Sequence, residues 1–203
     1  MKYLKLFENF SDIDTICQKF GIENYTINSD GSIDVGGDVD LMNYLGGLTK
    51  LPLKFRNVTG DFNCSHNQLT TLEGSPKSVN YFNCSHNQLT TLQGSPKSVN
   101  YFYCSHNKLT TLEGSPNIIR FINCSHNKLT TLEGSPQSVT SFYCGNNPVE
   151  SIWNLFRDYS QVDMLNDYDP VRDGGVIILG RLNEFLEQIG KPKVTSVKGY
   201  KCI

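Results

Sequence analysis

The chain has 203 residues, of which 38% are hydrophobic and 19% are charged, and its formal net charge is -2. This composition supplies enough apolar side chains for a packed core and excludes intrinsic disorder. The near balance of acidic and basic residues argues against a nucleic-acid partner held through its phosphates. No apolar run approaches the ~20 residues that span a bilayer, so no membrane partner is expected.

The first segment, residues 1–40, is expected to form an N-terminal cap made of a helix and a β-hairpin. Glu8 interrupts its apolar opening and no small-residue cleavage site follows, so we expect no secretory signal and a cytoplasmic protein. Ser11 is a suitable cap for a short helix that ends at Gly21. Residues 25–35 alternate in polarity on both sides of a Ser-Asp-Gly turn, which predicts the hairpin.

A 20-residue repeat fills the middle of the chain, with near-identical units beginning at Asn67, Asn87, Asn107 and Asn127. In each unit, apolar side chains and an asparagine recur at the spacing L-x-x-L-x-L-x-x-N-x-L; one copy reads V-N-Y-F-N-C-S-H-N-Q-L. One coil cannot bury its own apolar side, so the coils are expected to stack into a solenoid. A degenerate unit over residues 45–64 precedes the others. Its expected inward side chains are Leu48, Leu51, Phe55, Val58 and Phe62.

This pattern resembles the leucine-rich-repeat family, in its short bacterial subtype, over roughly residues 48–149. The resemblance implies an α/β repeat solenoid, a right-handed coil with parallel strands on one face, and it places the solenoid at residues 41–148. It also implies a non-catalytic module that binds a protein through the concave strand face. The whole chain is similar to phage-encoded repeat proteins of unassigned role, and its opening MKYLKLFENF resembles N-terminal segments of tailed-bacteriophage proteins.

Each slot of the repeat carries a structural expectation. The five asparagines spaced 20 residues apart are expected to form a ladder whose amides bond backbone groups of neighbouring coils. The glycine of each unit supplies a turn, and the proline two residues later sets an extended return segment. Around the inward Phe82, strand alternation predicts that Tyr81, Asn83 and Ser85 face outward.

After the repeats, residues 149–203 are expected to form a C-terminal helical cap with a short terminal strand. Apolar side chains recur at helical spacing from Val149 to Phe156, and residues 174–190 show the best amphipathic helical pattern of the chain. Residues 193–203 are expected to add an edge strand, with their lysines in solvent.

Five of the seven cysteines and all four histidines occupy fixed slots of the repeat. Parallel side chains in stacked coils point the same way, which suits a disulfide poorly, and a cytoplasm keeps thiols reduced. The Cys-x-His spacing admits a zinc surface, but a bend after the strand is expected to turn Cys84 inward and His86 outward. We therefore predict no metal and no cofactor. No phosphate loop, H-E-x-x-H motif or nucleophile elbow is present, so no enzyme is predicted.

The outward strand positions are the best candidates for a binding site, because exposed aromatics among polar neighbours are typical of interfaces. They form columns across the coils, and the copies differ there. The predicted binding residues are Tyr81, Asn83, Tyr101, Tyr103, Arg120, Phe121, Asn123, Tyr143, His86, His106 and His126. Two alternatives stay open: the columns only hold the coils together, or they bind a glycan.

The phage resemblance suggests two roles. The favoured one is binding of a protein partner, such as a host factor, in the bacterial cytoplasm. The alternative is a structural or virion-associated internal head protein without a specific ligand, because Leu-Phe-Glu at residues 6–8 resembles the cleavage motif of leaders in such proteins. The competing interpretation of this motif is an ordinary helical turn that packs Leu4 and Phe7 on the cap. The oligomeric state also stays open.

Overall fold

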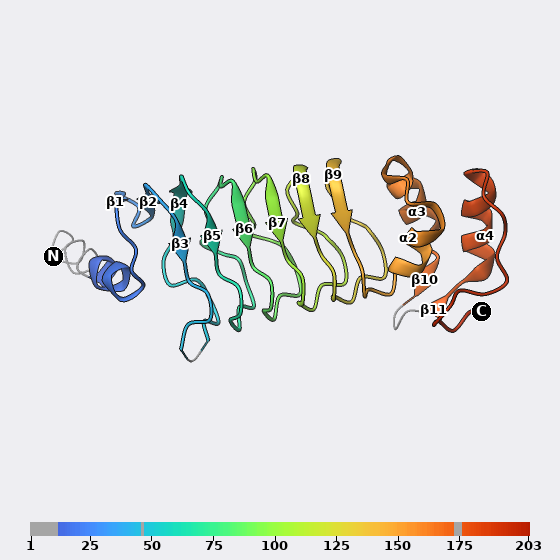
Figure 1. Ribbon diagram of the computed structural model, residues 1–203, viewed down its shortest axis with the longest axis horizontal. Helices are drawn as coiled ribbons and strands as arrows, with labels where there is room; N and C mark the ends of the chain where they lie inside the picture. Colours follow the sequence, from blue (N-terminus) through green and yellow to red (C-terminus); the bar gives the residue numbers. More distant parts are fainter. Residues whose placement is uncertain (1–11, 46, 173–175) are drawn as a thin grey trace.

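A computed structural model describes residues 12–45, 47–172 and 176–203, and it shows a β-solenoid whose coils succeed one another along the long axis of the molecule (Figure 1). Each turn contributes one strand to a six-stranded parallel sheet. In spatial order the strands are β3 (Val39–Asp40), β5 (Phe62–Asn63), β6 (Tyr81–Asn83), β7 (Tyr101–Tyr103), β8 (Ile118–Asn123) and β9 (Ser138–Tyr143). The predicted solenoid with parallel strands is confirmed, whereas none of the helices lies within the described repeat coils.

From β5 to β9, each strand residue pairs with the residue 20 positions later, which is the period of the sequence repeat. Each coil therefore places the same side chain above its counterpart. Phe62 and Phe82 stack inside the coil with ring centroids 5.3 Å apart, and Phe82 and Phe102 follow at 5.7 Å. The two leucines of each L-T-T-L segment are fully buried beside these rings. The predicted core is confirmed in its repeat positions.

Asparagine amides join successive coils through the buried interior of the turn. The Asn107 Nδ2 group donates to the carbonyl oxygens of Cys84 at 3.1 Å, Cys104 at 3.1 Å and Ser105 at 3.2 Å. Its Oδ1 accepts the backbone N–H of Leu89 at 3.0 Å. Equivalent contacts recur at the other four asparagines of this slot, so the predicted ladder is confirmed. Those four are Asn67, Asn87, Asn127 and Asn147.

In each coil, the segment that returns from the L-T-T-L leucines to the next strand is called here the return wall. It turns at a glycine, as the sequence predicts. Gly74, Gly94, Gly114 and Gly134 all have positive φ, from 75° to 93°. In each of these turns the residue after the glycine donates its N–H to the second leucine of L-T-T-L at 3.0 Å. The proline that follows is buried in every unit, and the chain then runs back to the next strand.

At the N-terminal end, a helix over residues 12–19 is followed by β1 (Tyr25–Ile27) and β2 (Ile33–Val35), which pair as the predicted hairpin. A turn at residues 20–21 follows the helix, and Gly21 in this turn has a φ of +63°. Ser11 and the leader-like motif at residues 6–8 lie outside the described residues. The strand β2 also pairs in parallel with β4 (Phe55–Val58), which joins the hairpin to the first coil.

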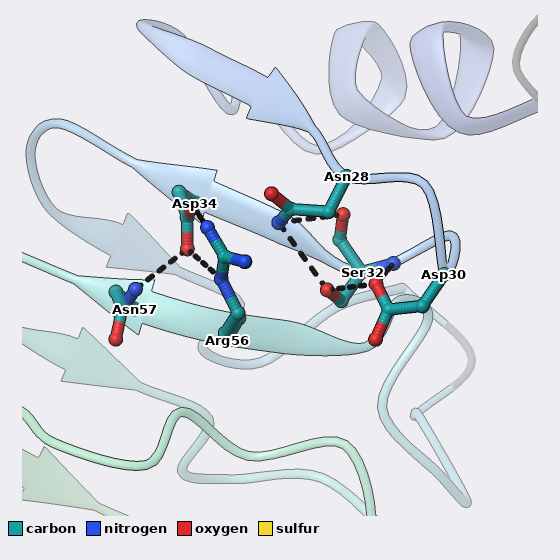
Figure 2. A network of polar contacts seen from close by, with 6 residues as sticks. All are labelled: Asn28, Asp30, Ser32, Asp34, Arg56 and Asn57. Carbon is teal, nitrogen blue, oxygen red and sulfur yellow. Dashed lines mark hydrogen bonds and ion pairs between the residues drawn. The ribbon is translucent and has the colours of Figure 1, made fainter.

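A polar network fixes this junction (Figure 2). The Arg56 guanidinium pairs with the Asp34 carboxylate, and its Nε donates to Asp34 Oδ1 at 3.0 Å. The Asn57 amide donates to the same oxygen at 2.8 Å. The Arg56 hydrogen bond is the main reason that the pKa of Asp34 lies below its ordinary value. Within the hairpin turn, Ser32 Oγ donates to Asp30 at 2.6 Å, so polar contacts hold both the turn itself and its junction with the first coil.

The described residues of the C-terminal end form three α-helices, a 3-10 turn and a small hairpin. The elements are α2 (Glu150–Phe156), the 3-10 turn η1 (Tyr159–Gln161), α3 (Val162–Tyr168), β10 (Val171–Arg172), β11 (Val176–Ile177) and α4 (Leu179–Gln188). The helix predicted over residues 174–190 is wrong in its first part, because Val176 and Ile177 pair with β10. The expected terminal strand is reduced to one bridge between Ile177 and Cys202. Among the described helices, none combines the length and apolarity needed to cross a membrane.

Candidate binding face

Five aromatic side chains stand on the outer face of the parallel sheet and form what we call the aromatic ladder. Its members are Tyr81, Tyr101, Tyr103, Phe121 and Tyr143. The contacts run diagonally from coil to coil: ring centroids are 5.0 Å apart for Tyr81 and Tyr103, 4.9 Å for Tyr103 and Phe121, and 5.3 Å for Phe121 and Tyr143. Tyr101 lies beside this line, 6.4 Å from Phe121. The structure thus brings together the aromatic residues that the sequence analysis selected.

The ladder is only partly shielded by its own stacking. Tyr143 remains 54% exposed and Tyr101 39%, whereas Tyr81, Tyr103 and Phe121 are half-buried. Tilted stacking of this kind stabilises neighbouring strands, and it also holds the rings in fixed orientations. A partner would therefore bind to rings that are already ordered in the free protein, so little side-chain entropy would be lost on binding.

The predicted asparagines of the face, Asn83 and Asn123, bond to backbone groups, unlike the stacked rings. Asn83 Oδ1 accepts the backbone N–H of Ser85 at 3.0 Å, and Asn123 does the same for Ser125 at 3.1 Å, so each side chain closes the turn after its strand. The expectation that Ser85 faces outward is wrong. Its side chain is buried, and its Oγ accepts a hydrogen bond from Ser105 Oγ at 3.1 Å, because the alternation of the strand ends at this turn. These polar residues therefore stabilise the turns beside the aromatic ladder and contribute little to its exposed surface.

Arg120 lies at the N-terminal border of the ladder, directly before Phe121. Its side chain is exposed, and it forms no ion pair with any described residue. In the two preceding coils the same slot holds Asn80 and Asn100, whose side chains bond each other at 2.9 Å. Arginine replaces the asparagine in the coil that carries Phe121, which gives this border of the ladder a positive charge.

The four histidines form a second column, which lies just beyond the C-terminal ends of the strands and runs from coil to coil. Consecutive rings from His66 to His126 are stacked with centroids 4.1 Å apart and interplanar angles of 11–12°. All four are exposed and have φ near +55°, a left-handed conformation that suits asparagine better than histidine. Asn146 takes this slot in the last coil, and its amide meets His126 Nε2 at 3.0 Å.

The stacked rings of this column do not converge on one point, as the ligands of a metal ion do. Parallel rings present equivalent nitrogens in the same direction, whereas zinc needs ligand lone pairs that converge on one tetrahedral point. Within the described residues, no group of three histidine, cysteine or acidic side chains is arranged to hold a metal ion. The cysteine slot faces inward, as predicted, and the thiols of Cys64, Cys84, Cys104 and Cys124 are free and fully buried. Cys84 is a fully buried core side chain, and this burial raises the pKa of its thiol well above the ordinary value.

The stacked histidines are expected to make the stability of the fold depend on pH. The pKa values of His86 and His106 lie below the ordinary value, first because neighbouring groups remove part of the water around these rings and second because the neighbouring imidazoles repel a positive charge. The unfolded chain therefore binds protons more readily than the folded one. This contribution to stability is complete above the unfolded histidine pKa of about 6.5 and is lost as pH falls through the lower folded values.

We therefore expect the urea midpoint of unfolding to fall between about pH 7.5 and about pH 5.5, where histidine titrates. A double variant, His86→Asn with His106→Asn, should show a smaller fall, because asparagine accepts the same backbone conformation without titrating. Equal pH dependence in the two proteins would contradict the assignment to this column.

Sequence reasoning missed a cleft of about 420 Å³ at the end of the sheet. One wall is the segment 141–145, which includes the last residues of β9, and the other is formed by α2 and its C-cap residue Arg157. On α2 itself, Glu150, Trp153 and Asn154 have the i, i+3, i+4 spacing of one helix face. The apolar spacing from Val149 to Phe156 identifies only the opposite face of α2, and nothing in the sequence indicates that this polar face lies against β9.

Comparison with protein-family models, with curated protein sequences and with solved structures finds no match to this chain. The class of the protein therefore rests on its own architecture, a parallel β-solenoid flanked by non-repeat segments.

Proposed function

We propose that the chain is a non-catalytic protein-binding module whose partner docks on the aromatic ladder. The proposal includes a coil of the leucine-rich-repeat type, with the segments before β3 and after β9 acting as caps. It also includes a phage origin, with a host protein met in the bacterial cytoplasm as the partner. The aromatic ladder is the observation that supports it, because tyrosine and arginine on a fixed scaffold are the residues that dominate binding energy at interfaces.

A partner pull-down from bacterial lysate tests the proposal. Tagged wild-type protein should retain a specific protein that the double variant Tyr101→Ala with Tyr103→Ala loses, since removing two central rings is expected to weaken binding more than ten-fold, or about 2 kcal/mol. The matched control is Lys77→Ala with Lys97→Ala, two exposed positions on the return wall. This control should retain the partner.

The second candidate is a structural or virion-associated protein without a specific ligand. The stacking within the ladder favours it, because rings 4.9–5.3 Å apart already contact one another and hold the coils together. Under this alternative neither protein retains a partner, and the Tyr101→Ala with Tyr103→Ala variant unfolds at lower urea concentration. Binding of a labelled oligosaccharide that is lost in the same variant would instead favour the glycan alternative.

A further inference from the structure

The hydrogen-bonding pattern of the solenoid is interrupted at its last strand. In the preceding coils, the cysteine after each strand donates its N–H to a carbonyl oxygen of the next coil: Cys104 to Asn123 at 2.9 Å and Cys124 to Tyr143 at 2.9 Å. No strand follows β9 in this sheet among the described residues, and the N–H of Cys144 has no acceptor in a following coil. An unpaired strand edge of this kind is a template for another extended segment.

The helix α2 replaces only part of the missing coil. The Trp153 ring lies 5.3 Å from Phe142, the separation found between successive core rings inside the solenoid. Glu150 Oε2 accepts the N–H of Asn146 at 2.7 Å, where the equivalent N–H of His126 donates to a backbone carbonyl at 2.8 Å. The core side and the turn of the missing coil are thus supplied, but its strand is not.

The place of this strand is the cleft between β9 and α2. Its floor is the strand edge, and Trp153 and Asn154 stand on the opposite wall. Tyr143 is the terminal ring of the aromatic ladder at the mouth of the cleft, and it contacts Phe121 on one side only. The cleft is therefore continuous both with the backbone hydrogen bonds that join successive strands and with the aromatic ladder of the sheet.

We propose that this cleft binds an extended peptide segment of a partner protein, which adds to β9 as a further strand. Backbone pairing with the β9 edge would supply affinity, and alternate side chains would supply selectivity. An aromatic side chain on the outer face would stack on Tyr143, as Tyr143 stacks on Phe121. The residue pointing inward must be small, because Trp153 already fills the core side beside Phe142.

Two features favour a peptide segment over a second copy of this chain. The helices α2, α3 and α4 follow β9 along the axis of the molecule, so the β9 of another copy, which carries the same helices, cannot approach this edge (Figure 1). The cleft also holds one acidic side chain, Glu150, and one basic side chain, Arg157, which favours a segment without net charge.

The fluorescence of Trp153, the single tryptophan of the chain, reports on the cleft directly. The probe is the blocked peptide acetyl-Ser-Val-Thr-Tyr-Gly-Tyr-Ser-amide, titrated into the wild-type protein. We expect a saturable change in tryptophan emission. Binding should weaken by about ten-fold or more when the backbone nitrogens of both tyrosines in the peptide are methylated, because methylation removes the N–H groups that would donate to β9. A similar loss is expected when phenylalanine replaces the peptide glycine, because the inward residue must be small.

The matched protein variants are Tyr143→Ala at the cleft and Tyr81→Ala at the far end of the ladder. The first should weaken peptide binding about ten-fold and the second should leave it unchanged. Absence of a saturable change, or equal binding of the methylated peptide, overturns the proposal. The Tyr101→Ala with Tyr103→Ala protein should still bind the peptide, so loss of partner capture through the ladder and loss of binding at the strand edge are separate results.

Discussion

Replacing Asn107 by alanine is expected to lower the free energy of unfolding by about 3–5 kcal/mol. The side chain is 8% exposed and makes four hydrogen bonds to backbone groups of two coils. Alanine leaves the N–H of Leu89 and the facing carbonyls buried without these partners, and each unsatisfied buried group costs about 1–3 kcal/mol. The loss is large because one amide serves three backbone segments at once.

Urea unfolding followed by far-ultraviolet circular dichroism measures this change. The control is Asn117→Ala, an exposed asparagine of the same coil in a slot that holds lysine or glutamine in the other units. It should change stability by less than about 0.5 kcal/mol. Similar losses for the two variants would contradict the role assigned to the asparagine ladder.

The substitution Gly114→Ala is expected to destabilise the protein by about 3 kcal/mol or more. Gly114 has φ +90°, and a β-carbon there would lie 2.5 Å from the backbone nitrogen of Gln93 and 2.6 Å from the carbonyl carbon of Leu92. These are backbone atoms of the preceding coil, so the coils must separate locally to admit one methyl group. Strain at positive φ adds to this cost.

The matched control is Gly180→Ala, within α4, where a β-carbon would meet nothing within 4 Å. Because alanine favours helix more than glycine does, this variant should gain up to about 1 kcal/mol. The two glycine variants should therefore shift the thermal midpoint in opposite directions. A Gly114→Ala protein as stable as the wild type would show that the coils can separate at this turn without cost.

The repeat slots could be predicted because each one imposes a local requirement in every unit. The inward Phe82, the amide of Asn87 and the turn at Gly94 follow from one coil stacked on its copy. Exceptions arise where contacts are not periodic. Simple alternation misplaces Ser85 because β6 ends at Asn83, two residues before it, and the Ser85 hydroxyl is covered by the turn that Asn83 closes.

Outside the repeats, sequence pattern identified elements better than it identified their bounds or neighbours. The apolar period of residues 174–190 continues through Val176 and Ile177, but pairing with β10 and with Cys202 makes these residues a strand. The cleft beside β9 depends on how α2 folds back over the sheet edge, which no local pattern of α2 encodes. The same holds for the contact of Arg56 with Asp34, which joins residues 22 positions apart.

The identical register from β5 to β9 makes the interior coils interchangeable modules. Each contacts only the coil before it and the coil after it, so a whole 20-residue unit can be deleted or duplicated without creating an unpaired amide or an unfilled core position. Such an event would bring the two terminal segments closer or move them apart by about 4.8 Å, the spacing of neighbouring strands. The length of the solenoid is thus expected to change in fixed steps of one coil when whole units are gained or lost.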